Sequence, residues 1–135
     1  MRPFLAGEAF GIWKLNPPFL TLVGNQKIVT LRIEPHVRGE VFTLDTLAED
    51  GQAWTSSSIL YLDGLRREFK DSTCSGTQMS RRVDDRTVEI LRECASGVQI
   101  RLVWRSVQPK VLIFEVTEKR RDGRRSERRL VMEKQ

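Results

Sequence analysis

Few residues of this chain are of the types that perform catalysis or bind metals. It contains one histidine, His36, and two cysteines, Cys74 and Cys94. A zinc site needs three or four converging nitrogen or sulfur ligands, so we expect His36 to be a solvated loop residue. Neither a Gly-x-Ser-x-Gly elbow nor a phosphate-binding glycine-rich loop occurs in the sequence. We therefore expect no metal, no cofactor and no enzymatic activity, and we keep an enzyme without a recognisable motif as a third hypothesis.

The two cysteines offer the clearest covalent chemistry. They flank an expected turn at Asp84-Asp85, and a two-residue turn there leaves them one residue short of facing each other, which a β-bulge would correct. Cross-strand cysteines with suitably placed Cβ atoms can form a disulfide, which implies an oxidising compartment. The alternative is a pair of reduced, partly buried thiols.

The formal net charge of +5 is concentrated in one segment. Residues 119–129 hold seven basic and two acidic residues, and the rest of the chain is balanced. No aromatic residue lies among them, so nucleic-acid bases would have nothing to stack on. We expect a solvated hairpin tip that binds no specific nucleic acid. The alternatives are contact with an anion, a membrane surface, nucleic acid or an acidic partner.

The elements that must position these residues are strands. Turn signals such as Asp50-Gly51, Asp63-Gly64 and Asp122-Gly123 recur at even spacing, and they favour tight hairpins. Apolar and polar residues alternate between them with a period of two, typical of antiparallel sheets with one buried face. The expected strands are 10–15, 27–34, 40–47, 53–62, 65–70, 77–83, 87–94, 98–106, 111–119 and 125–133.

These strands predict an all-β fold, a single antiparallel up-and-down meander barrel of eight to ten strands. With no helix to cover a sheet edge, closure is the usual solution. A length of 135 residues suits one domain spanning 1–135. Residues 1–9 are expected to be an N-terminal arm, and the Pro-rich segment 16–26 a first loop that covers one barrel mouth as a lid.

Residues 11–16, Gly-Ile-Trp-Lys-Leu-Asn, resemble the opening strand of a family of bacterial lipocalin-like β-barrel domains. Pro17-Pro18, Ile33-Glu34-Pro35 and the turn at 61–64, Tyr-Leu-Asp-Gly, are similar to the same family. The resemblance implies a barrel of the lipocalin and fatty-acid-binding-protein type, often exported, that binds small apolar molecules. Arg128 is followed by Arg129-Leu130 without a tyrosine, so a fatty-acid carboxylate clamp is not supported.

The resemblance, with strand parity, also assigns structural roles. Trp13 is expected to plug one end of the barrel beneath Arg128, an arrangement that stabilises through a cation–π contact. The alternative is an ordinary core tryptophan and a surface arginine. Hydroxyl residues 55–58 either line a polar cavity or lie on a solvated edge. The candidate ligand-binding interior consists of Trp54, Leu60, Leu102, Trp104, Leu112 and Phe114.

The first functional hypothesis is therefore non-enzymatic binding of a small, largely apolar molecule inside the barrel. The alternative is an interaction module with a filled core that uses the hairpin 119–129 against an acidic partner. A cavity of roughly 300 Å³ or more favours the ligand, and side chains that meet in the middle favour the module. No apolar run is long enough for a transmembrane helix. The compartment stays open between the cytoplasm and an exported location reached through a removed leader.

Overall fold

The described part of the chain forms eleven antiparallel strands in one sheet. We describe a computed structural model that defines residues 9–15, 22–23, 26–48, 50–70 and 74–135. The strands are β1 (Gly11–Leu15), β2 (Leu22–Val23), β3 (Gln26–His36), β4 (Gly39–Ala48), β5 (Ala53–Leu60), β6 (Arg67–Lys70), β7 (Ser75–Asp84), β8 (Thr87–Cys94), β9 (Gln99–Gln108), β10 (Val111–Lys119) and β11 (Arg125–Lys134). The all-β prediction and the expected strands are confirmed, with one addition. β2 lies within the segment 16–26 that we expected to be a loop, and Gln26 at its end begins β3. Residues 16–21 and 24–25 of that segment, and residues 1–8 of the expected arm 1–9, fall outside the described residues.

The sheet is a meander whose first strand lies in its middle. The order is β5-β4-β3-β1-β11-β10-β9-β8-β7-β6, with β2 paired to β3 off this path. Hairpins join most strands that follow one another, the exceptions being β1 with β2 and β5 with β6. Gly123 in the Asp122-Gly123 turn has a φ of 89°, a left-handed conformation that glycine adopts without strain. The exceptional ladder is β1 with β11, in which Trp13 faces Lys134.

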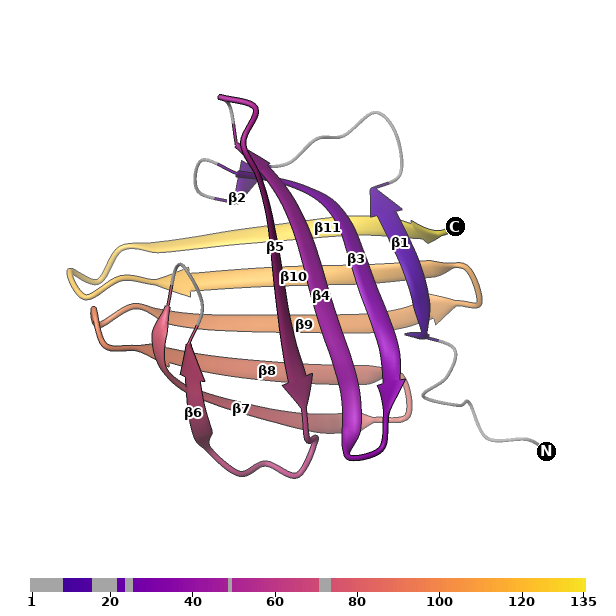
Figure 1. Cartoon of the computed structure of the whole chain (residues 1–135), viewed down its shortest axis with the longest axis horizontal. Helices are drawn as coiled ribbons and strands as arrows, with labels where there is room; N and C mark the ends of the chain where they lie inside the picture. The colour runs from indigo at the N-terminus through magenta and orange to yellow at the C-terminus, as the bar shows by residue number, and fades with distance from the viewer. Residues whose placement is uncertain (1–8, 16–21, 24–25, 49, 71–73) are drawn as a thin grey trace.

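The sheet curls into a half-barrel of two crossed layers. In Figure 1, β1, β3, β4 and β5 lie across β7 to β11 at a steep angle. Its two end strands, β5 and β6, are neighbours in sequence, yet no ladder joins them in the part of the chain that is described. The nearest pairing is one isolated bridge between Asp63 and Arg81. The predicted meander is confirmed, but a seam stays open between β5 and β6. β6 has only four residues, so it offers few backbone groups with which β5 could pair to close the barrel.

The space between the two layers is filled with apolar side chains. Phe42 of β4 stacks on Trp104 of β9 with ring centroids 5.2 Å apart, and it also contacts Phe114 of β10 at 6.3 Å. These contacts join opposite walls, so side chains meet in the middle of the half-barrel. The buried cluster includes Trp13, Leu31, Ile33, Phe42, Leu60, Val88, Ile90, Leu102, Trp104, Leu112, Phe114, Val116, Leu130 and Met132.

Candidate functional site

A cavity of about 410 Å³ lies at the seam between β5 and the β6–β7 side of the half-barrel. One bank is formed by β4 and β5, and the other by the connection 61–66, β6 and β7. The lining residues are Val41, Ser57, Ser58, Ile59, Tyr61, Leu65, Arg67, Glu68, Phe69, Lys70, Gln78 and Ser80. Apolar, neutral polar and charged groups are all represented, so the walls suit a molecule with both apolar and polar parts.

A buried arginine lies directly behind this wall. Arg92 of β8 is 8% exposed, because it belongs to the inward series of its strand. Its Nε donates to Oε1 of Gln78 at 2.8 Å, and its Nη2 donates to Oγ of Ser58 at 3.4 Å. Its guanidinium carbon lies 4.2 Å from the centroid of the Phe69 ring. Since all three partners line the cavity, Arg92 ties β5 to β6 and β7 across the seam and orients the polar groups of the wall.

The connection between β5 and β6 forms a fixed rim. Arg67 donates two hydrogen bonds to the carboxylate of Asp63, at 2.8 and 2.6 Å, and its guanidinium lies 3.9 Å from the Tyr61 ring centroid. The hydrogen bonds from Arg67 hold the pKa of Asp63 well below its ordinary range. Leu62 has a φ of 59° and donates its backbone N–H to Oγ of Ser80. A non-glycine residue in this region is strained, and such strain gathers at functional sites.

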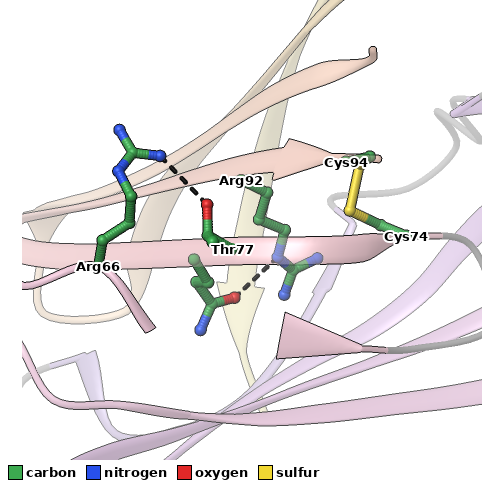
Figure 2. Close-up of a disulfide and its surroundings, with 6 residues drawn as sticks. Arg66, Cys74, Thr77, Arg92 and Cys94 are labelled. Carbon is green, nitrogen blue, oxygen red and sulfur yellow. Dashed lines mark hydrogen bonds between the residues drawn. A yellow bond between two sulfur atoms is a disulfide. The ribbon is translucent and has the colours of Figure 1, made fainter. Parts of the chain in front are cut away.

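A disulfide secures the far side of the site. Cys74 and Cys94 are bonded, with Cα atoms 5.1 Å apart, which joins the start of β7 to the end of β8. The pair packs with Phe69 in a small cluster separate from the main core. Figure 2 shows the disulfide on the strand pair that carries Arg92. The β-bulge between Arg82 and Asp84 does not bring the cysteines opposite each other as predicted, because Cys94 faces Gly76 in the β7–β8 ladder, two residues from Cys74.

A buried ion pair spans the same two sides near the other end of the seam. Nη2 of Arg82 in β7 lies 2.8 Å from Oε2 of Glu40 in β4, and Glu40 is 2% exposed. Burial raises the pKa of Glu40, while Arg82 acts to lower it. Among the described residues, Oε1 of Glu40 has no hydrogen-bond partner. The carboxylate is therefore costly to keep charged, although it links β4 to β7.

Most of the predicted interior residues lie in the core and not in the cavity. Leu60, Leu102, Trp104, Leu112 and Phe114 are all buried in the main cluster, and none of them lines the seam cavity. They pack against one another across the two layers, so they fill the space in which a central ligand was expected.

Trp54 departs from the prediction of an interior position. It shares strand parity with Leu60 but is 38% exposed. It is the second residue of β5 and faces Thr46 of β4, so it lies at the opposite end of the strand from Leu60. β5 is an edge strand, and its first residues extend beyond the core, so a side chain on its inward face is exposed there. Strand parity alone therefore gave the wrong environment for this residue.

The predicted contact between Trp13 and Arg128 is wrong. Trp13 is fully buried and its Nε1 donates to the Ala9 carbonyl at 2.8 Å. The cation near its ring is Lys134, whose Nζ lies 5.7 Å from the ring centroid. Arg128 faces Val116 near the start of β11 and is exposed, with Nη1 donating to the Glu127 carbonyl. The antiparallel register places the end of β11 against β1, so Arg128 lies too far along the strand.

The hydroxyl run 55–58 divides between the two expected environments. Ser57 and Ser58 line the cavity, and Ser57 also hydrogen-bonds Thr43 at 2.7 Å. Thr55 is exposed and donates to Asp45.

His36 accepts a hydrogen bond from the Arg38 backbone at its Nδ1, which is a local turn contact. Within the described ranges, no three His, Cys, Asp or Glu side chains are grouped for a metal ion.

Sequence reasoning missed the polar wall of the site. Gln78, Ser80 and Arg92 occupy inward positions that ordinarily hold apolar residues. A signal for Arg92 was present, because it shares parity with the buried Val88 and Ile90 of the same strand. Charged or amide residues on an otherwise apolar face indicate a partnered polar site.

The chain matches no family model and no curated protein in the comparisons with known proteins. The similarity of residues 11–16 to lipocalin-like domains therefore stays a prediction. No helix in the described residues could cross a membrane.

Proposed function

We propose that this protein is a non-enzymatic binding module that holds a small amphipathic molecule in the seam cavity. The supporting observation is the position of Arg92, which is buried and bonded to Gln78 and Ser58 behind a cavity of about 410 Å³. Ligand pockets usually measure about 300–1,000 Å³ and combine apolar walls with a few oriented polar groups.

This proposal moves the ligand from the centre of the barrel to its open seam. The contact between Phe42 and Trp104 leaves the middle of the half-barrel occupied by side chains. At the seam, Ile59, Leu65 and Phe69 offer apolar surface, whereas Ser80 and Gln78 offer hydroxyl and amide groups. A ligand with an apolar body and hydrogen-bonding groups at one end would satisfy both parts of the wall.

Native mass spectrometry of the purified protein tests the proposal by looking for a retained small molecule. Leu65→Asp places a charge at the cavity mouth, and Val37→Asp is its control, because Val37 is exposed in the β3–β4 turn and does not line the cavity. We expect retention in the parent and in Val37→Asp, and loss in Leu65→Asp. An empty parent protein, or equal loss in both variants, would contradict the proposal.

An interaction module is the second candidate, and the filled core is the observation that favours it. In this case the exposed hairpin 119–129 would contact an acidic partner, and the seam cavity would hold only water. Native mass spectra of an unliganded parent, together with salt-sensitive binding of an acidic peptide that Arg120→Ser/Arg121→Ser weakens, would favour this second function.

A further inference from the structure

A second, smaller concave site of about 260 Å³ lies on the outer face of the sheet, where β8 and β10 end and β9 and β11 begin. The strand register builds it from two rows of side chains that point away from the core. The first row is Glu93, Gln99, Lys119 and Arg125, and the second is Leu91, Arg101 and Thr117. Arg66, from the β5–β6 connection, lies at its border. We call this site the outer groove.

The outer groove gathers cations from four separate segments. Arg66, Arg101, Lys119 and Arg125 are the exposed cations that line it, and Glu93 is the single carboxylate of its lining. The buried Arg92 and the partly buried Ile100 also line it, from the inward series of β8 and β9. The sequence suggested that one hairpin carries the net charge by itself, but the fold adds two arginines from outside that hairpin. A cationic surface built from several elements is what distinguishes an anion-binding site from a solvated hairpin tip.

Ion pairs at the border orient these guanidinium groups. Arg66 lies 3.1 Å from Glu93, Arg101 lies 2.6 Å from Glu89, and Arg125 lies 2.7 Å from Glu127. Figure 2 shows the further bond from Arg66 to Thr77, at 3.2 Å. Each of the three ion pairs engages one nitrogen of its arginine. A guanidinium has five N–H donors, so each arginine can bind an anion in the groove while it keeps its carboxylate.

We propose that the outer groove binds a compact, multivalent oxyanion of the phosphate type. Arg66, Arg101, Lys119 and Arg125 would supply the charge, and Thr117 and Gln99 would supply neutral hydrogen-bond donors. A singly charged carboxylate would gain little binding energy here, because the arginines already pair with carboxylates of the protein. A small group that carries several negative charges would be attracted by all four cations at once. The lining contains no aromatic residue, so nothing there would stack on a nucleobase.

Isothermal titration calorimetry with inorganic tripolyphosphate tests this proposal on the whole chain at low salt, about 50 mM. Lys119→Ala/Arg125→Ala removes two groove cations. Arg38→Ala/Lys110→Ala is the matched control, because it removes the same charge from exposed turns outside the groove. We expect the groove variant to lose at least about tenfold in binding constant, as for lost charge-assisted contacts, and the control less than about twofold.

Two further titrations identify the anion and its source. Sodium acetate should bind far more weakly than tripolyphosphate, and a single-stranded oligonucleotide of equal phosphate concentration should not bind more tightly. Thr117→Val, which keeps the charge and shape of the groove, should also weaken tripolyphosphate binding. No binding of tripolyphosphate, equal losses in the groove and control variants, equal binding of acetate, or preference for the oligonucleotide would each overturn the proposal. Thermal melting of every variant separates loss of binding from loss of folding.

Discussion

Single residues in this protein connect layers that lie far apart in the sequence. Trp13 fills one end of the core and pairs with Lys134 in the β1–β11 ladder, Arg92 joins β5 to β7 behind the cavity, and Glu40 pairs with Arg82 across the same seam. Each is largely buried, so its contribution depends on partners that the sequence does not place beside it.

We expect Trp13→Ala to destabilise the fold by about 3–5 kcal/mol, because it empties a fully buried aromatic site. Trp13→Phe keeps most of the ring and removes the bond to Ala9, so its loss should be smaller. Trp54→Ala is the matched control, since Trp54 is 38% exposed. Urea unfolding of the three variants measures these differences, and a loss below about 1 kcal/mol for Trp13→Ala would show that Trp13 is not a core residue.

Glu40 should give the stability a distinctive dependence on pH. Burial raises its pKa in the folded protein above its ordinary value of about 4.5. The folded state therefore binds this proton more tightly than the unfolded state, and the contribution of Glu40 to stability is complete below that ordinary value. It is lost as the pH rises through the raised pKa.

Glu40→Gln removes this titration. We expect the unfolding free energy of the parent, minus that of the variant, to decrease as the pH rises from about 4 to 7. Urea melts at several pH values measure the difference. A difference that grows with pH would mean that the pairing with Arg82 outweighs burial, and that the carboxylate is favoured in the folded state.

At the scale of strands and hairpins, local sequence predicts most of the structure. The alternation in β3, β8, β9 and β10 identifies the buried face, and Asp50-Gly51 and Asp122-Gly123 turn the β4–β5 and β10–β11 hairpins, because both signals act between residues close in the chain. The third Asp-Gly, Asp63-Gly64, lies in the β5–β6 connection and forms no hairpin. Trp54 and Arg128 were misplaced because their surroundings depend on where an edge strand leaves the core and on the register of β11 against β1. The seam cavity escaped prediction for the same reason, since its two banks are joined by tertiary contacts.

The disulfide should be an important support of β7 and β8. It closes a loop with a sequence separation of 20, and a loop of this size contributes about 3 kcal/mol in the chain-entropy account. We expect Cys74→Ala/Cys94→Ala to lose about this amount of unfolding free energy. The parent in reductant should lose a similar amount, and the variant should not respond to reductant. Two titratable thiols in the denatured, unreduced parent would show that no bond forms.

The whole molecule is a curled sheet with an open seam on one side and a cationic groove on its outer face. The linings of the seam cavity and of the outer groove share no residue, but Arg92 lines the outer groove and also bonds the wall of the seam cavity. Both sites lie close to the connection 61–67, in which Arg66 reaches outward to Glu93 and Arg67 holds Asp63. Phe42 and Trp104 stack in the core and line neither site.

The ladder between β1 and β11 bears on how quickly the chain can fold. Nearly every other pairing joins consecutive strands, so those hairpins can form early with a small loss of loop entropy. Trp13 and Lys134 lie near opposite ends of the sequence, and their pairing must wait until the intervening strands have shortened the distance between them. We expect Trp13→Phe mainly to accelerate unfolding, whereas Ile90→Ala, in the local β7–β8–β9 unit, should slow folding. Stopped-flow chevrons in urea distinguish these effects, and a folding rate that responds more to Trp13 than to Ile90 would place the long-range closure before the hairpins.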